Sequence, residues 1–463
     1  MDNIMEFIKN REYYFDRVIY RYYSCSDGAQ MIINNLNNHT VTYLEDLSAM
    51  LFNILETSSY EEISLFLNEN DISSMELVDF IDDLRESLTL NCFARGTSTE
   101  NVESEESSSD SQVLDFHEKL FEEGYLFNFH MDITNECNIR CKHCYHPFED
   151  YCINGCLSLG DIERIIDDIY DLGVFSITLS GGEPFMREDI YEVLKYISQK
   201  GMCIDLFTNA TLLDDDSIGK LSEFNINKVS ISLYSMEDKI HDGITQCKGS
   251  YRKTKEAIGK LKAKNINVEL KAVLMKENFS GYKELLRFAK DNSYKMILDT
   301  SITPKLNSDL EPIGLSISEE QYRKLCLDKE TNYYANNNKP LSPNEPSCKA
   351  GRYGLYCDSI GNVQPCISFK LDLGKVSEIK RIWTRSEVLK KWLNIRNKDY
   401  WEYGKFTYCE YCLEICAGIA QLENFDFKKC EKSDCYKSKI RERVHKILKG
   451  GDYSEKVEDK ESC

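Results

Sequence analysis

Three cysteines lie close together near the end of the first third of the chain. Cys137 and Cys141 are separated by three residues, and Cys141 and Cys144 by two. Three thiolates in one short loop can bind three irons of a [4Fe–4S] cluster and leave the fourth iron without a protein ligand. An iron with an open position can bind substrate. The same spacing also fits a zinc site that takes a distant Cys or His as its fourth ligand.

The composition is that of a globular protein, because 42% of the 463 residues are hydrophobic and 29% are charged. The chain has 57 basic and 78 acidic residues, which gives a net charge of −21. This balance argues against nucleic acid or an anionic membrane as partner, since both are polyanions. No apolar run approaches the roughly 18 residues of a membrane span, and the first residues lack a signal-peptide pattern. We therefore expect a cytoplasmic protein with no nucleic-acid and no membrane partner.

Nineteen cysteines are unusual for such a protein. A reducing cytosol does not keep structural disulfides in a chain long enough to have its own core, so thiols at this density indicate metal binding. A second group of cysteines is far larger than packing needs, with inert buried thiols as the alternative. Its members are Cys348, Cys357, Cys366, Cys409, Cys412, Cys416, Cys430 and Cys435. The sequence thus predicts two separate metal-binding regions.

The elements that must position the first group alternate between strand and helix. Such alternation indicates an α/β fold with parallel strands and right-handed crossovers. Six units are fewer than the eight of a closed barrel, so we expect a partial (β/α)6 barrel of the TIM type, with chemistry at the carboxyl ends of the strands. The predicted strands are 127–134, 174–179, 202–208, 228–233, 267–274 and 296–299, and the clearest helices are 159–172, 189–200, 251–264 and 280–291.

A separate module precedes the barrel. Residues 97–112 hold six serines and five acidic residues, and this composition predicts a disordered linker. Before it, short strand patterns stand at 18–20, 31–33 and 41–43. Helical patterns follow at 44–56, 59–67 and 73–88, the last two with capping boxes. We therefore expect residues 1–96 to form a winged-helix-like domain.

The order of motifs along the predicted barrel resembles the radical S-adenosylmethionine (SAM) superfamily. The family's Cys-x3-Cys-x-aromatic-Cys motif matches the loop after the first strand, with His143 at the aromatic position. Ser180-Gly181-Gly182-Glu183-Pro184 follows the second strand, and Thr208-Asn209-Ala210 follows the third. Ser230-Ile231-Ser232-Leu233 and then His241-Asp242 stand at the fourth. Four matches in this order leave little room for coincidence.

This resemblance implies a SAM site at the carboxyl ends of the strands. The glycines let the backbone approach a ligand closely, and Glu183 offers a carboxylate to the ammonium group of SAM. The expected cofactor contacts are Gly181, Gly182, Glu183, His143, Asn209 and Ser232. In the family, an electron delivered by a donor such as flavodoxin or ferredoxin cleaves SAM, and the resulting 5′-deoxyadenosyl radical abstracts a substrate hydrogen. Relatives often carry Arg-Gly near Thr245-Gln246-Cys247, and we expect Cys247 to be a plain buried thiol.

The late cysteines resemble the SPASM extension, which carries two further [4Fe–4S] clusters. Cys348 with the Gly-x4-Cys segment that ends at Cys366 matches its first half, and Cys409, Cys412 and Cys416 match the second, followed by Cys430 or Cys435. Ala420 stands where the family has a cysteine, so one cluster uses Cys357 or Cys430 instead or keeps an open iron. The resemblance divides the chain into a core at 113–300, a bridging region at 301–347, a SPASM domain at 348–436 and a basic helix and tail at 437–463.

The N-terminal module resembles the peptide-recognition element of ribosomal peptide maturases, which binds a leader peptide at a sheet edge. Together these resemblances imply a maturase that installs a thioether from a cysteine of a precursor peptide. Carbon–carbon crosslinking and epimerisation are alternatives within this architecture. Formylglycine formation in sulfatases is a weaker one, because Ile367 replaces the expected Asp. A zinc-rich scaffold protein is the alternative from another class.

Overall fold

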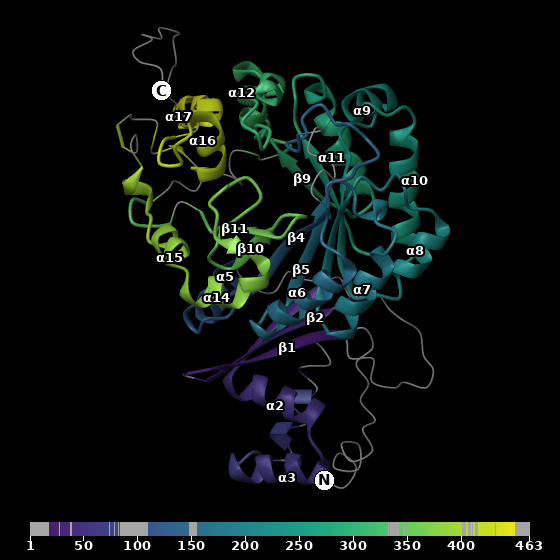
Figure 1. Ribbon diagram of the computed structural model, residues 1–463, viewed down its shortest axis with the longest axis vertical. Helices are drawn as coiled ribbons and strands as arrows, with labels where there is room; N and C mark the ends of the chain where they lie inside the picture. The colour runs from purple at the N-terminus through teal and green to yellow at the C-terminus, as the bar shows by residue number, and fades with distance from the viewer. Residues whose placement is uncertain are drawn as a thin grey trace.

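The computed structural model describes most of the chain (Figure 1). The described residues are 18–83, 110–147, 155–333, 342–400 and 404–449, except for 27, 38, 74, 78, 82, 332, 347, 406–408, 410, 413, 414 and 431. None of the described helices is long and apolar enough to cross a membrane.

Six parallel strands form the centre of the molecule, and each pairs with the next along the chain. They are β4 (Asn128–Thr134), β5 (Ser176–Gly181), β6 (Cys203–Thr208), β7 (Ile226–Ser232), β8 (Val268–Val273) and β9 (Lys295–Asp299). Their parallel order confirms the predicted α/β core, and the bounds lie within two residues of those expected.

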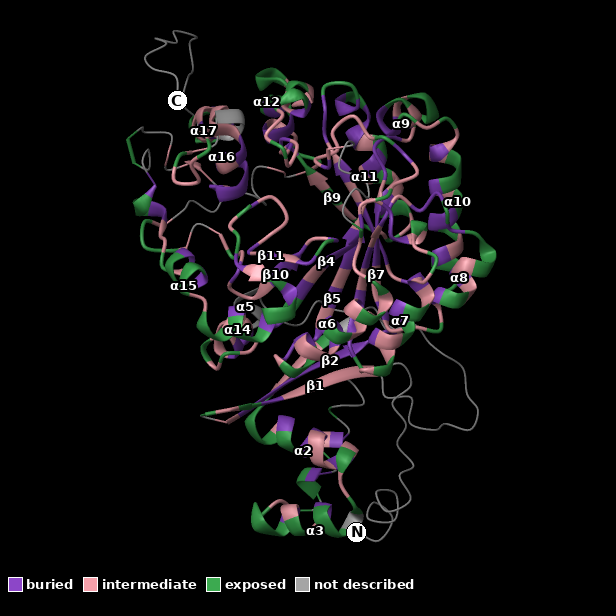
Figure 2. Cartoon of the chain, in the orientation of Figure 1, coloured by how far each residue is buried: buried purple, intermediate pink, exposed green. Residues whose placement is uncertain are grey.

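Helices between the strands cover one face of this sheet. They are α6 (Leu159–Asp171), α7 (Ile190–Gln199), α8 (Asp215–Leu221), α9 (Asp238–Thr245), α10 (Ser250–Ala263) and α11 (Tyr282–Asp291), with short turns η2 (Pro184–Met186) and η3 (Phe279–Gly281). Helix α6 begins with a capping box from Ser158 to Asp161 and buries an isoleucine stripe against the strands. Figure 2 shows buried residues concentrated along the central strands.

The cysteine-rich region is joined to the barrel sheet. Strand β10 (Gly354–Cys357) pairs in parallel with β4, and β11 (Asn362–Gln364) and β12 (Gly374–Lys375) add antiparallel strands beyond it. The sheet therefore has nine strands in the described chain, in the order β12-β11-β10-β4-β5-β6-β7-β8-β9. The later elements are η4 (Glu311–Leu315), α12 (Glu319–Leu327), η5 (Val376–Glu378), α14 (Ile379–Arg385), α15 (Glu387–Leu393), η6 (Asn397–Asp399), α16 (Ala417–Asn424) and α17 (Lys432–Leu448).

The N-terminal module contains a three-stranded antiparallel sheet, β1 (Val18–Cys25), β2 (Gly28–Asn35) and β3 (Thr40–Glu45), in sequence order. Helices α2 (Asp46–Thr57) and α3 (Tyr60–Glu69) follow. The predicted capping box at the start of α3 is present, and Ser73 and Glu76 make the equivalent bonds of the third predicted helix. Residues 84–88 of that helix lie outside the described residues. The winged-helix assignment itself stays a prediction.

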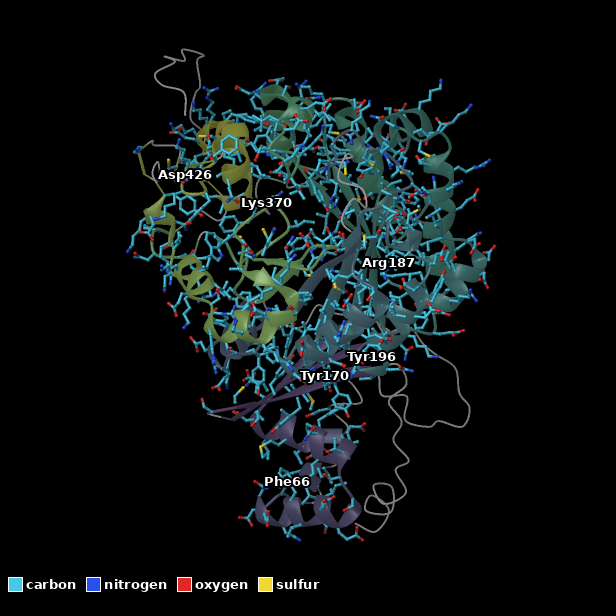
Figure 3. The ribbon with its side chains drawn as sticks, in the orientation of Figure 1. Phe66, Tyr170, Arg187, Tyr196, Lys370 and Asp426 are labelled. Carbon is cyan, nitrogen blue, oxygen red and sulfur yellow. The ribbon has the colours of Figure 1, made fainter. Side chains whose placement is uncertain are left out.

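This sheet packs directly beneath the barrel, at the amino ends of its strands (Figure 1). Tyr23 donates a hydrogen bond to the carbonyl oxygen of Gly173 at 3.0 Å, and Asn34 donates one to Asn227 at 2.7 Å. The guanidinium of Arg21 lies 4.2 Å from the ring centre of Tyr170, which Figure 3 labels just above the sheet. The module therefore has a fixed seat under the barrel in addition to its covalent connection.

The segment that connects this module to the barrel differs from its prediction at one end. Residues 97–109 of the predicted linker lie outside the described residues, but 110–112 begin helix α5 (Asp110–Glu122). Phe116 and Leu120 on this helix are buried between the N-terminal sheet and the barrel. The apolar residues after 112 anchor helix α5, and the helix then extends backward into the polar stretch. Adding one turn to an anchored helix costs little free energy, because nucleation is the unfavourable step.

The C-terminal basic segment also differs from its prediction. Helix α17 begins at Lys432, five residues before the expected start, and packs against α12. Lys437 is buried and donates to the carbonyl oxygen of Thr300 at 2.9 Å, and Arg441 is buried and donates to Tyr322 at 2.6 Å. These cations satisfy buried acceptors near the end of β9 and so join the C-terminal helix to the barrel. Residues 450–463 lie outside the described residues.

Candidate metal centre and cofactor site

The first three cysteines lie in the loop that follows β4. Burial, and then the neighbouring thiolates, raise the pKa of Cys144 to about 11 and that of Cys141 still further. The three thiols thus lie near one another in a partly buried loop. Burial favours their protonated form, and a bound metal cluster would stabilise them as thiolates. Within the described residues, no three His, Cys, Asp or Glu side chains converge on a single metal ion.

The main chain of this loop is fixed by helix α9. The N–H groups of Arg140 and Lys142 donate to the carbonyl oxygens of Thr245 and Ile244 at 3.1 and 3.0 Å. Within the loop, the N–H of Cys144 donates to the carbonyl oxygen of Cys141 at 3.1 Å. Because these bonds use only backbone atoms, the unusual Thr245-Gln246-Cys247 sequence can hold the loop in this way. Cys247 itself is partly buried.

Asn209 ties the end of β6 to the cysteine loop. Its side-chain N–H group lies 3.9 Å from the sulfur of Cys137 and donates to the side-chain oxygen of Asn138 at 2.9 Å. Its own oxygen accepts from the hydroxyl of Thr211 at 2.6 Å. An amide N–H near a thiolate stabilises the charged sulfur. The structure therefore brings this predicted residue to the first cysteine. Sequence reasoning missed Asn138, although its place directly after Cys137 was a signal.

His143 and Tyr234 line the other side of the loop. Their ring centres are 4.9 Å apart, and the hydroxyl of Tyr234 lies 4.0 Å from the sulfur of Cys141. Burial lowers the pKa of His143 to about 4, so the imidazole is neutral. Its Nε2 atom is buried and has no hydrogen-bond partner among the described residues. A buried polar atom beside the cysteines fits a bound cofactor. Tyr234 was missed by the sequence analysis, and Ser232 interacts with its hydroxyl at the end of β7.

The two glycines after β5 are required by the cysteine loop itself. Gly181 has φ of +128°, and a Cβ there would lie 2.1 Å from the carbonyl oxygen of Thr134. A Cβ at Gly182 would lie 2.2 Å from the carbonyl oxygen of Glu136. The N–H groups of Gly182 and Glu183 donate to these same two oxygens at 2.9 and 2.7 Å. The glycines thus allow the β5 loop to lie against the cysteine loop.

Glu183 connects two strand ends within the protein. Its side chain is buried and accepts hydrogen bonds from the Thr208 hydroxyl at 2.7 Å, the Asn209 N–H at 2.8 Å and the Phe185 N–H at 3.2 Å. Burial raises the pKa of this carboxyl group to about 7. The carboxyl group therefore joins the ends of β5 and β6. Its contact with the ammonium group of SAM stays a prediction.

Arg187 supports the same region from below (labelled in Figure 3). It donates to the carbonyl oxygens of Ile133 and Leu157 at 2.8 and 2.9 Å and forms an ion pair with Asp189 at 2.8 Å. This guanidinium fixes the end of β4, from which the cysteine loop departs. No motif of the sequence analysis included it.

Three of the late cysteines lie in segments that contact one another. A Cβ at Gly418 would lie 2.7 Å from the backbone of Ser368, so the start of α16 abuts the turn that follows Cys366. Cys416 caps α16, where its sulfur accepts from the Ile419 N–H at 3.5 Å. Lys370, labelled in Figure 3, donates its N–H to Gln421 at 3.0 Å and fixes this contact. Cys348 packs against the same core cluster as Cys366.

A second set of late cysteines lies near α17. The N–H of Cys412 donates to the carbonyl oxygen of Cys409 at 3.1 Å, and Arg441 of α17 donates to the carbonyl oxygen of Tyr411 between them at 2.6 Å. Cys435 lies on α17 itself and is disulfide-bonded, which differs from the predicted free metal ligand. The carbonyl oxygen of Cys430 accepts from Asn424 at 3.3 Å.

Cys357 is placed differently from the other late cysteines. It is fully buried at the end of β10, within the apolar core, and its sulfur donates to the carbonyl oxygen of Asp358 at 3.3 Å. An inert core thiol explains this position without a metal.

Comparison with known proteins agrees with this geometry. Residues 131–289 match the family model of the Radical SAM superfamily. The match begins in β4 and ends in α11, so it includes the cysteine loop and the Gly181-Gly182 loop. This part of the chain is a radical SAM domain.

The relatives that match longer parts of the chain are more varied. The chain is 23% identical over 323 residues to an AdoMet-dependent heme synthase of Oleidesulfovibrio alaskensis, which covers 62% of this chain and 80% of the relative. It is 25% identical over 255 residues to the subtilosin biosynthesis protein AlbA of Bacillus subtilis, covering 53% and 56%. Streptococcus suis SuiB bound to its precursor peptide SuiA superposes with a TM-score of 0.58 at 16% identity, covering 91% of this chain and 99% of SuiB. At that identity the likeness concerns the fold.

Proposed function

We propose that this protein is a radical SAM enzyme that installs a thioether from a cysteine of a ribosomally made precursor peptide. The observation that carries the proposal is the combination of three parts in one body. The N-terminal sheet lies under a radical SAM domain, and a cysteine-rich region continues the same sheet through β10. SuiB, crystallised with a precursor peptide, has a similar fold over nearly its whole length.

In this proposal Cys137, Cys141 and Cys144 hold a [4Fe–4S] cluster, which leaves one iron for SAM. When bound, these groups supply a 5′-deoxyadenosyl radical that removes a hydrogen atom from the substrate. The chain's own residues position the site. Asn209 and Tyr234 place polar hydrogens toward the sulfurs of Cys137 and Cys141, and the rings of His143 and Tyr234 exclude water from that side.

The late cysteines would hold two auxiliary clusters. We assign Cys348, Cys366 and Cys416 to one, because their segments pack together, and Cys409, Cys412 and Cys430 to the other, with Cys435 as a further ligand once its disulfide is reduced. Cys357 is left out because it lies in the apolar core. Thioether formation removes two hydrogen atoms from the peptide: one leaves to the radical, and the other as a proton to solvent and an electron. An iron–sulfur cluster is the one-electron acceptor that this balance needs.

The N-terminal sheet would bind the leader of the precursor. Strands β1 and β3 are the edges of this sheet, and an extended peptide can add to such an edge through backbone hydrogen bonds. The direct seat of the sheet on the barrel keeps a bound leader at a fixed distance from the radical site, so the tethered core is presented at high effective concentration.

Modification of a tetrapyrrole is the second candidate. It is favoured by the similarity to AdoMet-dependent heme synthases over 62% of this chain. The N-terminal sheet favours a peptide substrate over a tetrapyrrole, because a small rigid substrate needs no edge strand to bind it.

The test uses the full-length enzyme, reconstituted anaerobically with iron, sulfide, SAM and a reductant. The substrate is the Cys-containing peptide encoded beside the gene. We expect the peptide to lose two hydrogen atoms by mass spectrometry and its cysteine to become resistant to alkylation, while a Cys-to-Ser peptide stays unchanged. An unchanged peptide together with turnover of iron coproporphyrin III would replace the first candidate by the second.

A further inference from the structure

The inner face of the barrel sheet carries charged side chains. Along the strands, alternate residues such as Ile177, Leu179 and Val229 pack into the apolar core with the surrounding helices. The residues between them point away from these helices, to the face here called the inner face. One row of them stands in register across five strands, namely Tyr356, His130, Thr178, Asp205 and Lys228. Closed α/β barrels fill this position with branched aliphatic residues, so the polar row indicates contact with something other than protein core.

Three ammonium groups surround one buried carboxylate on this face. Glu269 on β8 has a side chain that is only 5% exposed, and it lies 3.5 Å from Lys271, 3.6 Å from Lys295 and 3.9 Å from Lys228. Lys228 also lies 3.7 Å from Asp205. All four distances exceed the roughly 2.7–2.9 Å of a hydrogen-bonded ion pair. Three cations thus share two carboxylates loosely and keep N–H donors for a further acceptor.

Two of these lysines remain accessible in the middle of the sheet. The side chain of Lys228 is 29% exposed and that of Lys271 is 34% exposed, although β7 and β8 are interior strands with neighbours on both sides. Their neighbours on the helix side, Val229 and Leu270, are fully buried. A ligand can therefore reach the ammonium groups from the inner face.

These lysines lie on strands whose carboxyl ends are near the cysteine loop. Lys271 on β8 pairs with Ser232 on β7. Ser232 is two residues before Tyr234, whose hydroxyl contacts the sulfur of Cys141. The ring of Phe207 lies 3.8 Å from the Lys271 nitrogen and directs it along the inner face. Lys271 lies two residues before the end of β8, so a group held there would lie on the inner face below the carboxyl ends of the strands.

We propose that Lys228 and Lys271 form a binding seat for a carboxylate of the substrate. The proposal rests on the proposed function, and there the carboxylate is an acidic side chain of the core peptide near the modified residue. Charge-assisted hydrogen bonds from two ammonium groups would anchor the peptide and set which residue faces the radical. A tetrapyrrole propionate has the same chemistry, and so does the carboxylate of SAM itself.

The test measures dissociation constants on the reconstituted full-length enzyme. The probes are tetraglutamate, tetraglutamine, iron coproporphyrin III and SAM. We expect tetraglutamate to bind about tenfold tighter than tetraglutamine, with an affinity that falls as salt rises. Lys228→Gln and Lys271→Gln each weaken the binding of tetraglutamate by about tenfold. Both variants keep an affinity for SAM within about twofold of the wild-type value. Lys271→Arg retains binding, because it keeps the charge and the donors. Lys264→Gln, at an exposed site after α10, is the matched control and changes nothing.

Each outcome decides the matter. Equal affinity of the wild-type protein for tetraglutamate and tetraglutamine would show that Lys228 and Lys271 do not bind a carboxylate of the peptide, and would overturn the proposal. A loss of SAM affinity in the Gln variants would overturn it too, since the lysines would then hold the cofactor. Loss of iron coproporphyrin binding alone would uphold a carboxylate seat and overturn the peptide function. If a Gln variant fails to fold, two measurements still test the proposal. They are the affinities of the wild-type protein for tetraglutamate and tetraglutamine, and the binding of tetraglutamate by Lys271→Arg.

Discussion

At the scale of single residues, Glu183 and Asp132 are two buried carboxyl groups of the barrel that accept hydrogen bonds from neutral donors. Glu183 is satisfied by three N–H and O–H donors, whereas Asp132 on β4 accepts from Tyr356 of β10 at 2.6 Å. The Nε2 atoms of His130 and His146 lie 3.7 and 3.5 Å from the two oxygens of Asp132. Burial raises the pKa of Asp132 to about 7 and lowers that of both histidines to about 4. This group is therefore largely neutral below pH 7.

Asp132 predicts a pH dependence of stability. Its pKa is raised from 3.8 in the unfolded chain to about 7 in the folded one, so between these values the folded protein holds the extra proton. The free energy of unfolding therefore falls as the pH rises through this window, by up to about 1.4 kcal/mol per pH unit from this group. Asp132→Asn keeps an acceptor for Tyr356 but cannot ionise. We expect denaturant titrations from pH 4 to pH 8 to show a flatter profile for the variant, and parallel profiles would contradict this assignment.

At the scale of elements, the site depends on one loop lying against another. The β5 loop contacts the cysteine loop through Gly181 and Gly182, and Glu183 and Asn209 then connect both to the end of β6. Strand β10 adds the late cysteines to the same sheet. A change at any of these contacts moves the first cysteine loop.

Gly182→Ala tests this contact. Its Cβ would lie 2.2 Å from backbone that cannot move without shifting the cysteine loop, so we expect a loss of roughly 2–4 kcal/mol of unfolding free energy. We also expect less iron bound after reconstitution. Gly259→Ala is the control, because this glycine lies exposed in α10 with no atom within 4 Å of the new Cβ. The control should gain up to about 1 kcal/mol from helix propensity. Equal stability of the two variants would show that the loops are not in tight contact.

The sequence predicted the strands of the barrel well because each is a local apolar pattern between polar loops. It also predicted that the cysteine loop follows the first barrel strand, since the three cysteines and this strand are neighbours in the chain. It could not predict that β10 pairs with β4, because four residues such as Gly354–Cys357 carry no signal for a partner more than 200 residues away. The internal role of Glu183 was hidden for the same reason, as its donors come from a different strand.

At the scale of the whole molecule, the N-terminal sheet is a structural neighbour of the barrel. Tyr23, Phe116, Phe127 and Phe175 form one buried cluster across this boundary. A polar path crosses it as well, because Asn34 of β2 donates to Asn227, which donates to Asp205 on the inner face at 2.6 Å. The N-terminal sheet and the barrel interior are thus in direct contact, although the predicted linker alone suggested a loosely attached module.

Tyr23→Phe tests this boundary. The variant keeps the ring and removes the hydroxyl that bonds to the carbonyl oxygen of Gly173, so a buried acceptor loses its donor. We expect a loss of about 1–2 kcal/mol of unfolding free energy and faster hydrogen exchange in β1. Tyr22→Phe is the control, because Tyr22 points to the opposite face of β1, toward α2. If both variants exchange like the wild-type protein, the sheet is not seated on the barrel in solution.

The central claim is that the chain binds one SAM-dependent cluster and two auxiliary clusters. The most direct measurement is iron and sulfide per chain after anaerobic reconstitution, with electron paramagnetic resonance spectra before and after SAM. We predict about twelve irons for the wild-type protein and a SAM-dependent change in the spectrum. The triple variant Cys137→Ala, Cys141→Ala, Cys144→Ala should keep about eight irons and lose that change. Zinc without iron, or an iron signal that SAM leaves unchanged in the wild-type protein, would contradict the account.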